Sequence, residues 1–469
     1  MASTGLEPSH REQMGMSLTD AGSAVEAQMK LRLLGRRGVG PAEDQEDLAA
    51  FEESKAQHAL GFSPLAVCVF VLANTVLGGS GMLGIPQAFS VAGSHLGLFL
   101  ICVFGTMSAF GCHLLQCTAR RIGEAPCTFY SVAARVCPRW SWLIDGAVAV
   151  KCLGVGTSYL IIVGDLLPQA MAAWGARGVL ASRWFCILIG FCVGAPLACL
   201  SNLSSLKYTS FCTLSIVLWT MVLVVVFFCG GMDPCDNGVD QLPCDGAKTL
   251  DIGDAGPVQF LKAFPVFIFG FTCQQNVFTV CNEVRQASKR RVDTIILVSY
   301  LIAGCAFAVT AFLAYSTYGD LLSHDVLQSY PQSIIVQVTR SLFACVAVFS
   351  YPLQVHPSRL SFLALLRLAC GPRNLDDTSP EFRRIEARRY YVVTVFLLAT
   401  SVTIALSVNS LGIVLGIVGA TGSTLVSYIL PGLMYFMAFQ TFHVKRIFAM
   451  CQFGLGCIIM PTCLAALFM

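Results

Sequence analysis

Three polar side chains that could bind or carry an ion lie within long apolar stretches of this sequence. Lys151 brings an ammonium group, Asn74 an amide oxygen and Ser350 a hydroxyl. Polar and ionisable groups are unfavourable in an apolar medium, and those that remain there mostly serve a function. Oxygen ligands suit a hard cation such as Na⁺. A buried ammonium can instead replace a cation or carry a proton.

Lys151 also has a purely structural interpretation, in which it only pairs with a carboxylate such as Asp145, Asp165 or Glu283. Asp165 lies fourteen residues further along the same expected helix, so the two side chains cannot touch along it. We favour Lys151 as a proton-carrying residue, because ionisable groups within apolar spans are functional candidates by default.

The segment from Asn74 to Pro86, NTVLGGSGMLGIP, is apolar but rich in residues that interrupt a helix. An interrupted helix survives in an apolar medium only where protein encloses it around a cavity. Its free N–H groups favour a carboxylate, and its free C=O groups favour a cation. The candidate ligands are Gly78, Gly79, Ser80 and Gly81. The alternative is that these glycines only allow close helix packing.

A second interrupted segment covers residues 264–276, with Pro265, a glycine and several polar residues. Carbonyls near Phe269, Gly270 and Thr272 are candidates to hold an ammonium group. Two interrupted helices five spans apart point to a five-plus-five inverted repeat, with the binding site between its halves.

The composition places these segments in a polytopic membrane protein. Of 469 residues, 55% are hydrophobic and 12% are charged, whereas about a quarter are charged in soluble domains. We predict an all-α fold with eleven transmembrane helices. Their approximate limits are 64–91, 95–118, 142–173, 184–200, 207–230, 258–281, 293–318, 332–356, 390–408, 410–438 and 449–468.

Residues 1–62 are polar and are expected to form a disordered cytosolic tail, followed by a membrane domain over 63–469. The expected inner loops hold eighteen lysines and arginines against three in the outer loops, which predicts a cytosolic N-terminus and a lumenal or extracellular C-terminus. Arg340 is expected to reach the outer interface. Cys235 and Cys244 lie in an acidic outer loop and are candidates for a disulfide. No metal-ligand spacing is present, apart from the candidate Na⁺ ligands Asn74 and Ser350.

Five segments together resemble the amino acid/auxin permease family. Besides the first interrupted span, they are 151–165 (KCLGVGTSYLIIVGD), 271–283 (FTCQQNVFTVCNE), 350–359 (SYPLQVHPSR) and 418–424 (VGATGST). The resemblance is strongest to fungal-type vacuolar amino acid transporters, with the sodium-coupled neutral amino acid transporters as a sister group. It implies a leucine-transporter-like fold, an eleventh helix outside the repeat and a substrate-facing Tyr159.

We therefore expect a secondary transporter of neutral or cationic amino acids in a vacuolar or lysosomal membrane, driven by protons through alternating access. A sodium-coupled importer of the plasma membrane and an amino-acid sensor signalling through residues 1–62 remain alternatives. If the protein were a sensor, residues 1–62 would bind a cytosolic partner. We expect no enzyme, no cofactor besides the coupling ion and no nucleic-acid partner, because no catalytic constellation or phosphate-binding loop is present.

Overall fold

The computed structural model describes residues 64–77, 80–123, 129–138, 141–199, 207–235, 246–248, 256–278, 288–370 and 380–469. Within these residues all regular structure is helical. The tail, Gly78, Gly79, Cys244 and Glu283 lie outside them, and so does the side chain of Asn74.

Both expected interruptions are present. The first span divides into α3 (Pro64–Leu77) and α4 (Gly81–Ala92), and Pro86 lies inside α4 without ending it. The sixth span begins as α10 (Pro257–Gly270), which is followed by three non-helical residues and the short 3₁₀ helix η4 (Gln274–Asn276). Helix α10 therefore ends at Gly270 rather than at Pro265, and α4 begins at Gly81.

The other helices follow the expected spans, with two clear differences at the ends. Helix α13 continues to Cys370 through Pro352 and Pro357, and α14 begins at Pro380, ten residues before the expected start. The remaining helices are α5 (Ser94–Ile122), α6 (Phe129–Val136), α7 (Ser141–Ala173), α8 (Arg183–Cys199), α9 (Lys207–Phe228), α12 (Lys289–Tyr318), α13 (Ile334–Cys370), α14 (Pro380–Ser407), α15 (Leu411–Val418), α16 (Leu430–Ala438) and α17 (Val444–Leu467).

Two π-helical segments, η7 (Gly419–Ser423) and η8 (Leu425–Ile429), connect α15 to α16. Thr424 shows this wider winding, because its hydroxyl donates to the carbonyl of Gly419 five residues earlier (2.7 Å). Such π-turns are rare and occur mostly at functional sites. The tenth expected span is thus continuous but has the wider π-helical winding in these two segments.

Seven helices among the described residues are long and apolar enough to cross a membrane, and α8 and part of α9 are shorter apolar helices. The interrupted spans fall below that length because each is divided. This all-helical arrangement fits a polytopic membrane protein. That eleven spans cross the membrane stays a prediction, and so does the inverted repeat.

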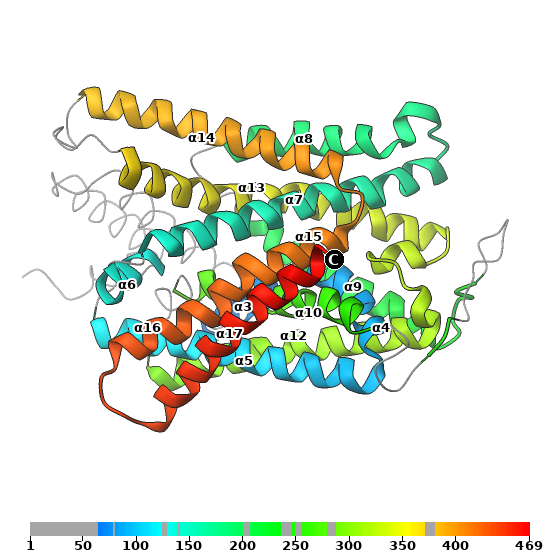
Figure 1. Ribbon diagram of the computed structural model, residues 1–469. Coiled ribbons are helices and arrows are strands. Elements are labelled where there is room, and N and C mark those ends of the chain that lie inside the picture. Colours follow the sequence, from blue (N-terminus) through cyan, green and yellow to red (C-terminus); the bar gives the residue numbers. More distant parts are fainter. Residues whose placement is uncertain are drawn as a thin grey trace, which may run out of the picture. The chain divides into compact units, whose positions relative to one another are not determined.

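The helices of the membrane domain form two groups (Figure 1). Helices α7, α8, α13 and α14 pack together, while α3, α4, α5, α10 and α12 form the other group. Helix α15 contacts α7 on one side and α10 on the other, so it bridges the two groups. The binding candidates from the first, third and sixth spans therefore meet where the groups face each other.

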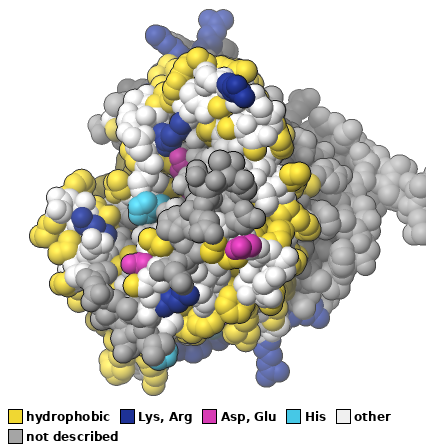
Figure 2. Space-filling model, turned by 90° about the vertical axis from the view of Figure 1, so that its right-hand side faces the viewer, with side chains coloured by type: hydrophobic (Ala, Val, Ile, Leu, Met, Phe, Trp, Pro, Cys, Tyr) yellow, Lys and Arg dark blue, Asp and Glu magenta, His cyan; other side chains and the backbone are white. Residues whose placement is uncertain are grey.

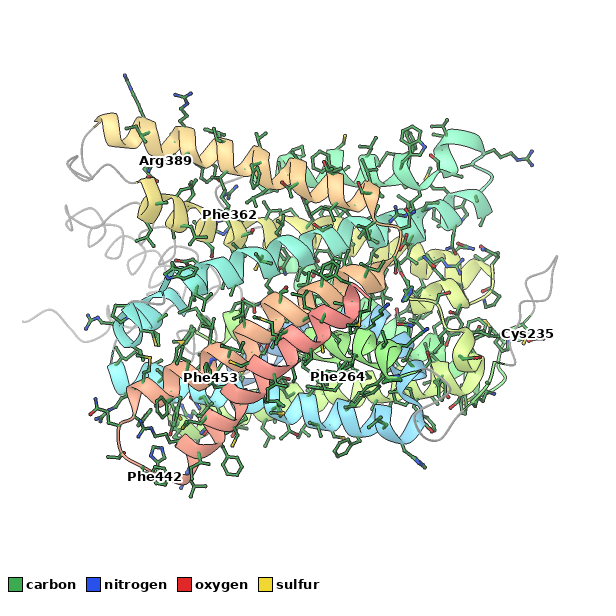
Figure 3. All side chains as sticks on the ribbon, in the orientation of Figure 1. Cys235, Phe264, Phe362, Arg389, Phe442 and Phe453 are labelled. Atoms are coloured by element: carbon green, nitrogen blue, oxygen red, sulfur yellow. The ribbon has the colours of Figure 1, made fainter. Side chains whose placement is uncertain are left out.

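One end of these helices is marked by the loop that carries Cys235, opposite the end that carries Arg389 and Phe442 (Figure 3). Seen from the side of Cys235, this end shows isolated acidic, basic and histidine side chains among apolar ones (Figure 2). Cys235 is disulfide-bonded. Its expected partner, Cys244, lies outside the described residues, so the pairing stays a prediction.

Candidate functional site

A polar cavity lies between the two interrupted spans, α7 and α13. Six of the predicted residues line it, namely Gly81, Lys151, Tyr159, Phe269, Gly270 and Thr272. Its other lining residues are Thr75, Val76, Val155, Gln275 and Gln354. Residues that are more than 250 positions apart in the sequence thus surround one space, as expected for a site between two halves of a transporter.

The two interruptions touch each other through their glycines. A Cβ atom built on Gly81 would lie 2.9 Å from the Cα atom of Gly270, which is backbone and cannot turn away. On the other side, a Cβ atom on Gly270 would meet the end of the Ile85 side chain at 2.4 Å. Glycine is therefore required at Gly81 for α4 and α10 to approach this closely.

Lys151 enters the cavity from α7 and is 4% exposed. Its backbone packs against the π-helical η7, where a Cβ atom on Gly422 would come within 2.7 Å of the Lys151 Cβ atom. Within the described residues, no hydrogen bond or ion pair reaches the Lys151 ammonium group. Asp165 pairs with Arg183 instead (2.9 Å). Among the described residues, the side-chain amine of Lys151 thus lines the cavity without a protein partner, and in its protonated form an anionic group would complement it.

Tyr159 lies two turns beyond Lys151 on α7 and is hydrogen-bonded to the side chain of Gln354. Gln354 comes from α13 and also lines the cavity. The side-chain oxygen Oε1 of Gln275 is buried and has no hydrogen-bond partner within the described residues. The cavity wall therefore offers hydroxyl and amide groups beside the ammonium group of Lys151.

The structure places other candidates away from this space. The Ser80 hydroxyl is hydrogen-bonded to that of Ser158 on α7 (2.8 Å), and Ser158 donates to the carbonyl of Val155 (2.8 Å). Ser80 and Ser350 are buried but are not among the lining residues. Gly78, Gly79 and the Asn74 side chain lie outside the described residues.

Three lining residues, Thr75, Val155 and Gln354, were not singled out from the sequence. Gln354 lies four residues after Ser350 on α13, so it belongs to the same helix face, one turn further along. The segment 350–359 (SYPLQVHPSR) contains both residues, so their helical spacing could have identified Gln354. Thr75 is the residue next to the candidate Asn74 in the sequence.

The open end of α10 is held by side chains from neighbouring helices. The carbonyl of Phe271 accepts hydrogen bonds from the Ser108 hydroxyl of α5 (2.7 Å) and from the Tyr300 hydroxyl of α12 (3.0 Å). A buried carbonyl that lacks its helical partner must find another donor. These two hydroxyls supply it, which fixes the interruption in place.

A second polar cluster lies in the connection between α12 and α13. Arg340 is fully buried rather than at an interface, contrary to expectation, because its guanidinium group donates to the carbonyls of Leu327 (2.8 Å) and Tyr330 (2.7 Å). Burial, reinforced by the nearby Asp165, raises the pKa of Asp325 to about 8. The neighbouring His324 packs against Gly412 at the start of α15.

The chain matches the family model described as transmembrane amino acid transporter protein over residues 66–469. It belongs to this transmembrane amino acid transporter family. It is 33% identical to vacuolar amino acid transporter 5 of Schizosaccharomyces pombe over 78% of this chain and 83% of the relative. It is also 30% identical to vacuolar amino acid transporter 6 of Saccharomyces cerevisiae, over 85% of this chain and 97% of the relative. The resemblance seen in the sequence is thus confirmed, and a transporter rather than an enzyme is indicated.

Proposed function

We propose that this membrane protein moves amino acids across a vacuolar membrane and that a proton gradient drives the movement. Family membership and the vacuolar transporters among its relatives support the substrate class and the membrane. The observation that carries the coupling proposal is the buried Lys151 side chain, which lines the cavity between the two interrupted helices and has no partner within the described part of the chain.

An amino acid brings a carboxylate and an ammonium group into this low-dielectric space, and both need partners. In the proposed mechanism, protonated Lys151 and the free N–H groups at the start of α4 hold the carboxylate. Carbonyls at the end of α10, near Phe269 and Gly270, hold the ammonium group. Because Lys151 is the charged side chain among the described lining residues, we expect neutral amino acids to be preferred over cationic ones.

Coupling follows from the charge on Lys151. A carboxylate binds more tightly to the protonated lysine than to the neutral one, and by linkage the bound carboxylate also favours the protonated lysine. Proton and amino acid are therefore taken up and released together. Alternating access would expose the cavity first at one end of the helices and then at the other, with the interrupted helices as gates. In this proposal eleven spans cross the membrane, with the N-terminus cytosolic.

The deciding experiment measures uptake of radiolabelled amino acids into proteoliposomes that contain the purified protein. One set receives a pH gradient without Na⁺, and a second set receives a Na⁺ gradient without a pH gradient. We expect uptake under the pH gradient alone, and at least a tenfold loss in Lys151→Met. Lys445→Met, which removes an exposed lysine at the start of α17, serves as the matched control.

Two other outcomes contradict the proposal in different ways. Uptake that requires Na⁺ and is lost in Asn74→Ala or Ser350→Ala would identify a sodium-coupled importer. Binding of an amino acid without uptake under either gradient would favour a sensor.

A further inference from the structure

Helix α17 inserts one carboxamide into the interior of the membrane domain. The residues of α17 that are buried recur every three or four positions, and Gln452 is the one long polar side chain among them. Other faces of the helix expose apolar side chains such as Phe448 and Ile458. Phe453, the next residue after Gln452, marks this helix in Figure 3. Burying an amide in this setting requires hydrogen-bond partners.

The amide nitrogen of Gln452 finds acceptors on two other spans, whereas its Oε1 atom has no partner among the described residues. Its Nε2 atom donates to the carbonyl of Ser427 (2.9 Å) in η8 and to the carbonyl of Met107 (3.2 Å) in α5. Gly111 leaves room for this arrangement, since a Cβ atom there would lie 2.6 Å from the Ser427 carbonyl oxygen and 3.0 Å from Gln452 Nε2. The side chain therefore joins α17, η8 and α5 at one point.

The Ser427 carbonyl lies in η8, four residues before a proline. In an α-helix this carbonyl would accept a hydrogen bond from the N–H of residue 431. Residue 431 is Pro431, which has no N–H. Gln452 supplies a donor from another helix in its place. The π-helical turn of η8 is thus stabilised from outside its own span.

The hydroxyl of the same Ser427 reaches the interruption in the sixth span. It donates to Gln274 Oε1 (2.8 Å) and to Thr272 Oγ1 (3.1 Å). Gln274 Nε2 in turn donates to the Ser108 hydroxyl (2.6 Å), which holds the carbonyl of Phe271. Thr272 lines the cavity. A continuous set of hydrogen bonds therefore runs from α17 to the cavity wall.

We infer that Gln452 is a positioning residue for the binding cavity, acting through Ser427 on the segment from Thr272 to Gln275. The eleventh span, which the resemblance sets outside the repeat, then has a defined part in binding. It holds the π-turn of the tenth span, and that turn holds the non-helical part of the sixth span in its binding geometry. This inference rests on the proposed function for its substrate, but its structural step does not.

The test compares Gln452→Met with wild type in two measurements. Methionine keeps the length of the side chain and removes the amide. Hydrogen–deuterium exchange of purified protein in detergent reports on the backbone at residues 271–278 without any ligand. We expect exchange there to become at least five times faster, because the loss of one hydrogen bond shifts a local equilibrium by roughly this factor.

Equilibrium binding of tritiated L-alanine, L-glutamine and L-leucine gives the second measurement. We expect Kd to rise roughly five- to tenfold in Gln452→Met, with the amount of folded, monodisperse protein unchanged. Ser427→Ala should weaken binding in the same way. The double variant should be no weaker than the weaker single variant, because both changes interrupt one connection.

Thr462→Val on the same helix is the matched control, since the Thr462 hydroxyl donates to the carbonyl of Ile458 in its own helix (2.8 Å). It should leave both measurements unchanged. Unaltered exchange at residues 271–278 in Gln452→Met would overturn the inference whatever the substrate. So would an unchanged Kd with a lower yield of folded protein, which indicates a purely structural role. Faster exchange without binding of any amino acid in wild type would instead count against the proposed function alone.

Discussion

At the scale of single residues, the cavity depends on a contact between two glycines. Gly81 and Gly270 allow the backbones at the two interruptions to meet. This contact is made by backbone atoms alone, so a single added methyl group would disturb its geometry.

Gly81→Ala is expected to separate α4 from α10 and to lower both the melting temperature and the rate of uptake. The added Cβ atom would lie 2.9 Å from the Gly270 Cα atom, and overpacking of this kind typically costs about 1–3 kcal/mol. Gly146→Ala on α7 is the control, because its Cβ atom would meet nothing within 4 Å. Gly146→Ala should be neutral or slightly stabilising. Equal effects of the two substitutions would contradict the packing argument.

Asp325 predicts a pH dependence of stability. Its pKa in the folded protein, about 8, lies above the ordinary value of 3.8. The folded state therefore binds the proton more tightly, and stability falls as pH rises from about 4 to about 8. Asp325→Asn stays neutral and keeps an oxygen for the N–H of Leu327, which now donates to Asp325 Oδ1 (3.0 Å).

The measurement is the melting temperature of both proteins at several pH values. Asp325→Asn should exceed wild type at pH 8 and approach it at pH 4. Burial lowers the pKa of the neighbouring His324, but this acts on both proteins and cancels in the comparison. A difference that does not vary with pH would show that Asp325 does not titrate in this range.

The sequence indicated those cavity residues that are marked by their immediate neighbours in the chain. The glycines and prolines at 78–86 and 265–270 predicted where the helices stop, and Lys151 was conspicuous as a charge in an apolar span. Ser80 is different, because its hydroxyl meets Ser158 of another helix, and no local pattern gives that pairing. Arg340 was misplaced for the same reason: its carbonyl partners come from a loop that precedes its helix.

At the scale of helices, Arg183 connects three spans. It forms an ion pair with Asp165 of α7 (2.9 Å) and donates to the carbonyl of Val408 (2.9 Å) just beyond the end of α14. The side chain of Asp165 is 9% exposed and that of Arg183 is 25% exposed. The pair therefore lies mostly inside the protein, where removal of one partner leaves the other charge unbalanced.

Arg183→Met should destabilise the protein by roughly 3 kcal/mol, observed as a lower melting temperature in detergent. Replacing both partners, in Arg183→Met with Asp165→Leu, should recover part of the loss. The control is Arg367→Met, since the Arg367–Glu386 pair joins α13 to α14 with Arg367 59% exposed. An exposed pair contributes about 0–1 kcal/mol. A double variant less stable than Arg183→Met would refute this account.

Helix ends were predicted less well than helix positions. The eighth expected span ended at residue 356, but α13 continues through Pro352 and Pro357 to Cys370. Proline is tolerated in such helices when neighbouring groups satisfy the freed carbonyls. The π-helical segments η7 and η8 were not predicted at all, and they contact Lys151 and Gln452 of other helices, which no local pattern gives.

At the scale of the whole molecule, the family match begins at residue 66, after the polar tail. The membrane domain alone contains the cavity and the connections that surround it. The proposed transport function therefore does not require residues 1–60.

Deletion of residues 1–60 should leave uptake per reconstituted molecule within about twofold of wild type, because it removes none of the described residues that line the cavity. The measurement is uptake into proteoliposomes at matched protein content. Unchanged amino-acid binding with abolished uptake would mean that the tail takes part in the transport cycle, contrary to this expectation.

The position of Arg183 also bears on how the chain is assembled during synthesis. Its carbonyl partners at Ala405 and Val408 lie more than 220 residues further along the chain, whereas Asp165 precedes it by 18 residues. When α8 leaves the ribosome, Asp165 is the one partner of Arg183 that has already been synthesised. We therefore expect the Arg183–Asp165 pair to form within the α7–α8 hairpin before α14 is synthesised, and the carbonyls of Ala405 and Val408 to join it afterwards.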